Sequence, residues 1–247
     1  MRIKAIFVSL ATFLMTIFWP TNALAVSIKV PILTYHYIAS NPNPKDRQRD
    51  ALSTSPDKFE AQMDYLAKNG YTPITLDTLY GIFNNQTSTP AKPVVLTFDD
   101  GYIDFYTSAF PILRRFNFHA VEFIPTGLIG GSYYMNWNQI KEIQSSGLVT
   151  FEAHTVTHAN LASLNYAAAL KQLKDSKDVL YSQTGYPVNF IAYPYGVSNG
   201  SVQSAAKAAG FVGGLGTWYG RSSNPSMNMP RIRISGQMSL KDFASRL

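Results

Sequence analysis

The 247-residue sequence contains no cysteine, which excludes disulfides, cysteine-ligated zinc and thiol catalysis. Histidine is scarce as well, so any metal ion must be held by the four histidines or by aspartate and glutamate. Charged residues make up 15% against 46% hydrophobic residues, a balance typical of a globular chain and not of a disordered one. The Lys and Arg residues form no dense block, and we therefore expect no nucleic-acid partner.

Long apolar runs are missing everywhere except at the N-terminus. There, Arg2 and Lys4 precede an almost unbroken apolar run over residues 5–19. The tripeptide Ala-Leu-Ala at 23–25 then matches the small-x-small pattern of a signal peptidase site. We therefore predict a signal peptide over residues 1–25. An uncleaved anchor helix is the alternative, although the run is short for a membrane span.

A signal peptide of this kind predicts an exported protein, working extracellularly, at the cell surface or in the periplasm. The mature part, residues 26–247, is expected to be one catalytic domain without stable membrane insertion. Its net charge falls from +6 to +4, because the removed segment holds two basic residues and no acidic one (6 − 2 = 4). An excess this small gives only a mild attraction to an anionic wall or glycan.

Short β-branched or aromatic runs alternate with longer helix-like segments in the mature chain, a pattern that predicts parallel β/α units. Seven or eight such strands favour a closed barrel, with an open doubly wound sheet as the alternative. Strands are expected over 30–35, 71–75, 93–98, 119–125, 149–153, 188–193, 211–215 and 231–234. Helices are expected over 56–69, 76–84, 103–117, 136–146, 163–184 and 199–209, and surface loops over 39–54 and 85–92.

Two carboxylates follow the apolar strand that ends in the sequence TFDDGY. Asp99 and Asp100 stand at the mouth of the predicted sheet, before a turn at Gly101. Because neighbouring side chains on a strand point in different directions, the two carboxylates can do different jobs. A helix N-cap explains one aspartate as well, but it does not account for two.

Two of the four histidines also follow a predicted strand, in the sequence FEAHTVTH. His154 and His158 are four residues apart, and in a helical turn they would lie on one face and converge on one ion. The alternative interpretation of this spacing is two ordinary surface histidines that bind no metal. His154 and His158 would, together with Asp100, form a two-His, one-carboxylate site with open positions for water and substrate. Such a site activates water, and Asp99 could then accept its proton.

Two further segments end strands at the same predicted edge. Tyr193-Pro194-Tyr195-Gly196 is a turn sequence that can present a backbone N–H to a developing oxyanion. His36 follows a short apolar strand in the sequence PILTYHYI, whereas His119 has no polar neighbours and receives no role. Taken alone, both the turn and a lone histidine are more often structural.

Together, the motifs TFDDGY, HTVTH and YPYG resemble, in order, those of the polysaccharide deacetylase family, carbohydrate esterase family 4, also called the NodB homology domain. The resemblance runs from about residue 30 onward. It implies a distorted (β/α) barrel and a metal-dependent hydrolase that removes acetyl groups from an N-acetylated polysaccharide. It also implies a divalent metal, zinc first and otherwise cobalt, nickel or iron. The polysaccharide is the expected partner, and we expect a monomer.

The resemblance also assigns roles to residues. It implies that Asp99 is the catalytic base and that the backbone N–H of Tyr195 contributes to the oxyanion hole. The implied metal ligands are Asp100, His154 and His158.

The sequence departs from the family pattern at two points. The family places an arginine two residues before the proline of its third motif, and this sequence has Ala192 there. It also has no histidine after His158, where the family usually has a catalytic one. Both departures are similar to a circularly permuted branch that acts on poly-N-acetylglucosamine. By that similarity His36 is the candidate general acid, and Arg231 or Arg233 is the candidate replacement for the missing arginine.

Three functions are compatible with these residues. The first is a glycan N-deacetylase acting on poly-N-acetylglucosamine, peptidoglycan or chitin oligomers, in that order of expectation. The second is an O-acetyl esterase on xylan-like polymers, because the same metal site serves amides and esters. The third is a non-catalytic cell-surface glycan-binding protein, which the missing arginine would suit.

Overall fold

The computed structural model describes residues 28–43 and 45–247, so the predicted signal peptide lies outside the described part of the chain. Within that part, none of the helices has the length and apolar character needed to cross a membrane.

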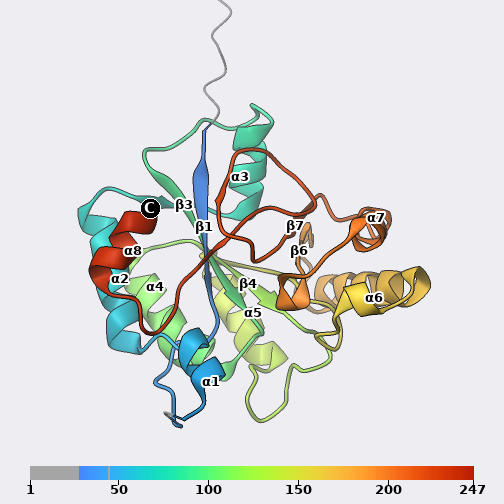
Figure 1. The fold of residues 1–247 in the computed structure, drawn as a ribbon, viewed down its shortest axis with the longest axis horizontal. Helices are drawn as coiled ribbons and strands as arrows, with labels where there is room; N and C mark the ends of the chain where they lie inside the picture. Colours follow the sequence, from blue (N-terminus) through green and yellow to red (C-terminus); the bar gives the residue numbers. More distant parts are fainter. Residues whose placement is uncertain (1–27, 44) are drawn as a thin grey trace, which may run out of the picture.

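A single curled sheet forms the centre of the molecule (Figure 1). All eight predicted strands are present, and among the strands of the described residues the pairing of β8 with β1 is the one that is antiparallel. The strand order is β7-β6-β5-β4-β3-β1-β8, with β2 beside β3 and β9 beside β1. The strands are β1 (Val30–Tyr35), β2 (Thr72–Pro73), β3 (Pro93–Asp99), β4 (Ala120–Ile124), β5 (Val149–Ala153), β6 (Phe190–Ala192), β7 (Gly213–Leu215), β8 (Arg221–Ser222) and β9 (Ile232–Arg233).

The segment 229–233 bridges the gap between the two ends of the parallel sheet. Met229 forms a parallel bridge with Leu215 of β7, and β9 pairs with Leu33 and Thr34 of β1. The sheet is therefore a distorted half-barrel whose open side is spanned by this segment. The predicted barrel is confirmed, and the open doubly wound alternative is wrong.

Helices cover the outside of the curled sheet, and α1 lies at the end where the parallel strands terminate (Figure 1). Polar caps start most of them; Asn136 and Gln139, for example, form a reciprocal capping box at α5. The helices are α1 (Arg47–Leu52), α2 (Pro56–Lys68), α3 (Leu76–Phe83), a π-helical turn (Phe105–Ala109) that continues into α4 (Phe110–Phe116), α5 (Trp137–Ser145), α6 (Tyr166–Thr184), α7 (Gly200–Ala208) and α8 (Leu240–Arg246).

Three of these elements correct the predictions. The expected loop over 39–54 contains α1, whose Asp46 cap accepts a hydrogen bond from the Arg49 N–H. The single helix expected over 103–117 is a π-helical turn followed by α4. Helix α8 was not predicted, and Phe243 is its one buried residue.

Alternation along the strands decides which side chains reach the interior of the barrel. On β3, Val95 belongs to an apolar cluster inside the barrel, whereas Leu96 and Phe98 pack in the cluster beneath the helices. Since side chains alternate with a period of two, Thr97 and Asp99 face the interior together with Val95. The Asp99 carboxylate therefore lies at the inner mouth of the barrel, next to the apolar side chains that fill the interior of the barrel.

Candidate active site

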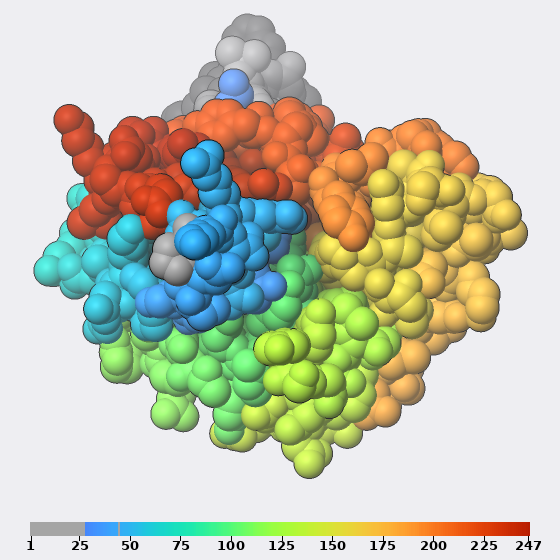
Figure 2. All heavy atoms as spheres, turned by 60° about the horizontal axis from the view of Figure 1, so that its bottom comes forward, coloured from blue at the N-terminus to red at the C-terminus, as the bar shows by residue number. Residues whose placement is uncertain are grey.

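A cleft of about 620 Å³ opens at the carboxyl ends of the parallel strands, the edge at which barrel enzymes carry their chemistry. Figure 2 turns this end of the molecule forward and shows the blue segment around α1 on one side of it. All six predicted site residues line the cleft, namely His36, Asp99, Asp100, His154, His158 and Tyr195. The edge predicted from strand order is therefore where these side chains meet.

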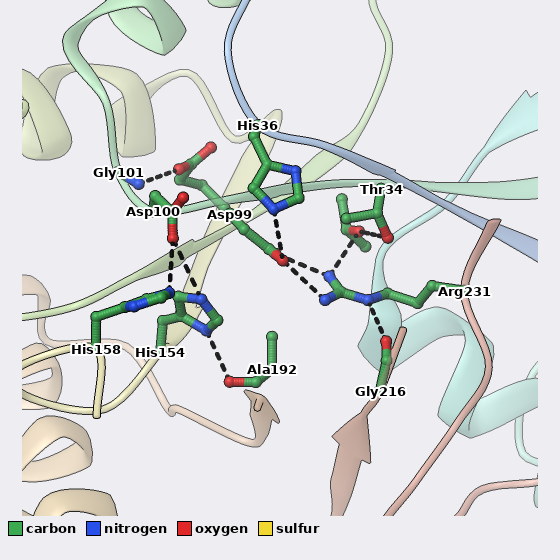
Figure 3. A network of polar contacts seen from close by, with 12 residues as sticks. Thr34, His36, Asp99, Asp100, Gly101, His154, His158, Ala192, Gly216 and Arg231 are labelled. Atoms are coloured by element: carbon green, nitrogen blue, oxygen red, sulfur yellow. Dashed lines mark hydrogen bonds and ion pairs between the residues drawn. The ribbon is translucent and has the colours of Figure 1, made fainter. Parts of the chain in front are cut away.

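Asp100, His154 and His158 form the one metal-type cluster found among residues 28–43 and 45–247. The Asp100 Oδ1 lies 3.4 Å from the His154 Nε2 and 3.2 Å from the His158 Nε2 (Figure 3). Ligands of a tetrahedral ion with bonds of about 2.0 to 2.1 Å are separated by roughly 3.3 Å. The Asp100 Oδ1 is moreover buried and has no hydrogen-bond partner among the residues that the structure describes. These three residues therefore fit a divalent metal ion.

The backbone that carries the two histidines is not helical, which corrects the expected helical turn. Residues 154–158 form an irregular bend after β5, and Thr155 and His158 have left-handed φ angles of 68° and 56°. The Gln172 side chain on α6 accepts hydrogen bonds from the N–H groups of Val156 and Thr157. The histidines thus converge through a strained bend held by α6.

A backbone carbonyl group fixes the orientation of the His154 ring. Its Nδ1 donates a hydrogen bond of 2.7 Å to the carbonyl oxygen of Ala192, which leaves the Nε2 directed at Asp100 (Figure 3). A carbonyl that accepts from the second ring nitrogen is the usual support for a metal-binding histidine, since it fixes the tautomer and the ring plane. Ala192 lacks the arginine side chain of the family pattern, but its backbone still serves the site.

Arg231 occupies the place left by the missing arginine. Its two terminal nitrogens each donate a 2.8 Å hydrogen bond to an Asp99 oxygen, and its Nε donates to the Gly216 carbonyl. Both partners of this bidentate pair are almost completely buried (Figure 3). Arg233, the other candidate, is exposed and lines the outer cleft. The segment that spans the open side of the barrel therefore supplies the arginine.

Two pKa shifts follow from this geometry. Burial alone would raise the pKa of Asp99, but the adjacent Arg231 guanidinium, with help from His154 and His36, holds that pKa below its usual value. Burial lowers the pKa of His36, while the charges of Asp99 and Asp100 oppose this effect. Asp99 is therefore ionised at neutral pH, as a proton acceptor must be.

The remaining predicted residues, His36 and Tyr195, lie near different members of this centre. His36 follows β1, and its Nε2 lies 4.0 Å from an Asp99 oxygen. Tyr195 has a left-handed φ of 62°, and its ring packs edge-on against His158 at 4.8 Å. His119 is not among the residues that line the cleft.

Glu122 is a buried residue of the site that the sequence analysis did not single out. From β4, its Oε1 accepts a 2.9 Å hydrogen bond from the Gly101 N–H, and burial raises its pKa well above the usual value. It thereby holds the turn in which Asp100 adopts a left-handed φ of 82°. The sequence feature that could have identified Glu122 is a single acidic residue inside the apolar strand AVEFI.

Removing the Arg231 guanidinium is expected to destabilise the fold. Arg231→Met would leave the buried Asp99 charge unpaired, which typically costs roughly 3 to 5 kcal/mol of unfolding free energy. Arg233→Met is the matched control, because Arg233 is exposed; it should change stability by less than about 0.5 kcal/mol. Denaturant unfolding measures both, and equal effects would contradict the assignment of the buried pair to Arg231.

This fold and this site define a class of protein, namely α/β-barrel enzymes that carry an Asp-His-His metal site beside a buried carboxylate. The sequence profile described as "Polysaccharide deacetylase" matches residues 86–214. The putative polysaccharide deacetylase YxkH of Bacillus subtilis is 30% identical over 88% of this chain and 75% of its own length. The chain belongs to the polysaccharide deacetylase family.

Two further relatives agree with this assignment. The poly-beta-1,6-N-acetyl-D-glucosamine N-deacetylase of Staphylococcus aureus is 32% identical over 74% of this chain and 68% of its own length. The structure of the Streptococcus pyogenes deacetylase PplD in complex with acetate superposes with a TM-score of 0.82 at 32% identity. That superposition covers 89% of this chain and 98% of the other.

Proposed function

We propose that the protein is an exported, metal-dependent N-deacetylase that removes acetyl groups from N-acetylglucosamine units of an extracellular polysaccharide. The observation that carries this proposal is the Asp100–His154–His158 cluster beside the buried Asp99–Arg231 pair. Poly-N-acetylglucosamine is the first candidate polymer, supported by the named activity of the Staphylococcus aureus relative. Zinc is the first candidate metal, with cobalt, nickel or iron as the others that suit these ligands.

Each residue of the site has a separate role in the proposed reaction. Asp100, His154 and His158 would hold a divalent ion, which would supply Lewis-acid chemistry by polarising the acetyl carbonyl and lowering the pKa of water. Asp99 accepts the proton of the attacking water, and Arg231 fixes the orientation of the Asp99 carboxylate. The Tyr195 N–H donates to the carbonyl oxygen as that oxygen gains negative charge. The carbon–nitrogen bond then breaks, and acetate and a free amine leave.

The leaving nitrogen needs a proton, because an amine anion is a very poor leaving group. His36 is our candidate for this acid, since His154 and His158 are assigned to the metal. Its Nδ1 is buried without a hydrogen-bond partner among the described residues, and its Nε2 faces Asp99 at 4.0 Å. In Figure 3 the His36 ring lies above the Asp99 carboxylate, with the metal cluster to the left and Arg231 to the right.

His36→Gln is expected to bind metal normally and to lose most of its rate on N-acetylglucosamine oligomers, by about 10²-fold or more. Activated aryl acetates should lose much less, because their leaving group needs no proton. His119→Gln is the matched control and should keep both rates. If His36→Gln deacetylated the oligomers at nearly the wild-type rate, Asp99, protonated after the attack, would become the more probable acid.

Acetate release from a small panel of polymers tests the proposed function directly. We expect release from poly-N-acetylglucosamine, with peptidoglycan and chitin oligomers as weaker substrates, and we expect a chelator to abolish it. Release from acetylated xylan alone would instead favour the O-acetyl esterase. A protein that purified without stoichiometric metal and released no acetate from any polymer would favour a glycan-binding protein.

A further inference from the structure

Glu152 is a buried carboxylate of β5 that no step of the proposed reaction uses. The residue is 1% exposed. Its neighbours in the strand, Phe151 and Ala153, pack in the cluster beneath the helices, so that Glu152 points into the barrel. Burying a carboxylate among apolar side chains costs free energy unless hydrogen bonds satisfy it. The partners of Glu152 therefore indicate what the residue does.

Its hydrogen-bond partners among the described residues are backbone groups at the start of β6. The N–H groups of Asn189 and Phe190 each donate a 2.8 Å hydrogen bond to the Glu152 Oε2. These bonds matter because β6 pairs with β7 over three residues but with β5 at one position, Ala153 with Ile191. The carboxylate thus supplies hydrogen bonds to the part of β6 that is not paired with β5.

A second side chain of the same segment holds the other end of β6. His154 lies two residues after Glu152, where side chains of an extended chain point to the same face. Its Nδ1 donates to the carbonyl of Ala192, the last residue of β6 (Figure 3). Two side chains next to each other on one face therefore hold both ends of β6. They fix its register, since a strand that is paired at one position can slip along its neighbour.

The register of β6 matters to two contacts of the proposed reaction. The Ala192 carbonyl has to lie behind the His154 ring to direct the Nε2 at Asp100. The turn that contains Tyr195 follows β6 directly, and Tyr195 has a left-handed φ of 62°. The direction of the Tyr195 N–H is therefore set by where β6 ends.

We propose that Glu152 is a positioning residue for the deacetylation. By holding the start of β6, it sets both the Ala192 carbonyl behind His154 and the Tyr195 N–H beside the reacting carbonyl. Glu152 is not among the residues that line the cleft, so it acts through β6 and not by contact with the substrate. This inference rests on the proposed function, because Tyr195 has its role there.

The test compares Glu152→Met, which removes the acceptor, with Glu152→Gln, whose carbonyl can still accept from both N–H groups. Glu152→Met should lower kcat on N-acetylglucosamine oligomers roughly tenfold, a fraction of the 10²- to 10³-fold lost when an oxyanion donor is removed outright. KM should stay nearly unchanged, because the weakened contact forms in the transition state. Glu152→Gln should keep kcat within about twofold of the wild type.

Zinc binding gives a second measurement that does not depend on turnover. The Kd for zinc, measured by adding zinc to the metal-free protein, should rise about tenfold in Glu152→Met, the lower end of the effect of losing support for a metal-binding histidine. Glu152→Gln should bind zinc with nearly the wild-type Kd.

Leu66→Ala is the matched control for lost stability. Leu66 is fully buried on α2, which packs against α4 and α8, and it does not belong to the cleft lining. A cavity at Leu66 destabilises the fold. Unfolding curves should show that Leu66→Ala and Glu152→Met are both less stable than the wild type, whereas kcat and the zinc Kd should change in Glu152→Met alone.

A Glu152→Met protein that was less stable but kept the wild-type kcat and zinc Kd would overturn this inference. If Glu152→Met does not fold, Glu152→Asp decides, because its carboxylate is withdrawn by one carbon–carbon bond of about 1.5 Å. It should show both losses to a smaller degree, and wild-type values would overturn the inference. A wild type that bound zinc but released no acetate from any polymer would instead overturn the proposed function.

Discussion

Asp99→Asn is expected to lower the rate of acetate release by about 10² to 10⁴-fold while metal remains bound. Asparagine has almost the same shape as aspartate, but its amide cannot accept the proton of the attacking water. The proposed metal ligands Asp100, His154 and His158 are untouched, so metal content should stay stoichiometric. Steady-state kinetics and metal analysis on the same preparation measure the two quantities.

The interpretation of Asp99→Asn depends on the fold remaining intact, because Arg231 loses its buried charge partner. Unfolding curves must therefore show that the variant is folded at the assay temperature. Asp178→Asn is the matched control, since Asp178 lies on the exposed face of α6 and, within the described part of the chain, forms an ion pair with Lys174 alone. A decrease of less than tenfold for Asp99→Asn would point to another base.

Alanine at Asp100, His154 or His158 should remove metal and activity together. Losing a group that merely orients a ligand typically costs 10- to 100-fold in metal affinity, and losing the ligand itself is expected to cost more. Metal content by elemental analysis and acetate release should fall in parallel in each variant.

His119→Ala provides the control for this series, because His119 is the one histidine outside the cleft. It should retain wild-type metal content and rate. If any of the three cluster variants kept full occupancy and full rate, that residue would not be a ligand. Adding the divalent metal back to chelated wild-type protein should restore activity, whereas the ligand variants should need far higher metal concentrations.

The strands and the metal cluster could be predicted because local sequence encodes both. An apolar run that ends in a polar motif marks the carboxyl end of a parallel strand, and these ends meet at one edge of the sheet. Asp100 and His154 are placed by this rule alone, whatever the precise shape of the barrel. The helical turn expected for His154 and His158 was wrong because the bend is held by hydrogen bonds that the Val156 and Thr157 N–H groups donate to Gln172, a residue of another element.

The arginine that pairs with Asp99 and the short helix α1 could not be predicted, because their positions depend on contacts between residues far apart in the sequence. Arg231 and Arg233 are two residues apart on one short segment, so strand alternation does not distinguish them, and only the register of that segment against β1 decides which one reaches Asp99. Helix α1 has no buried residue, so it leaves no apolar periodicity in the sequence. Tyr37, Asp104 and Tyr133 line one hollow beside the cleft only through loop packing, and their spacing in the sequence gives no signal of it.

The Asp99–Arg231 pair joins residues 132 positions apart in the sequence. A folding intermediate that had assembled the strands from β1 to β7, but not the segment 229–233, would bury a carboxylate with no counter-charge. Such an intermediate should be poorly populated, because an unpaired buried charge is costly. Closing the barrel and completing the active site therefore become one cooperative event, slowed by the long loop that must first be closed. A protease that cut the chain between β7 and β9 would therefore inactivate the enzyme, although every residue of its metal cluster would be unchanged.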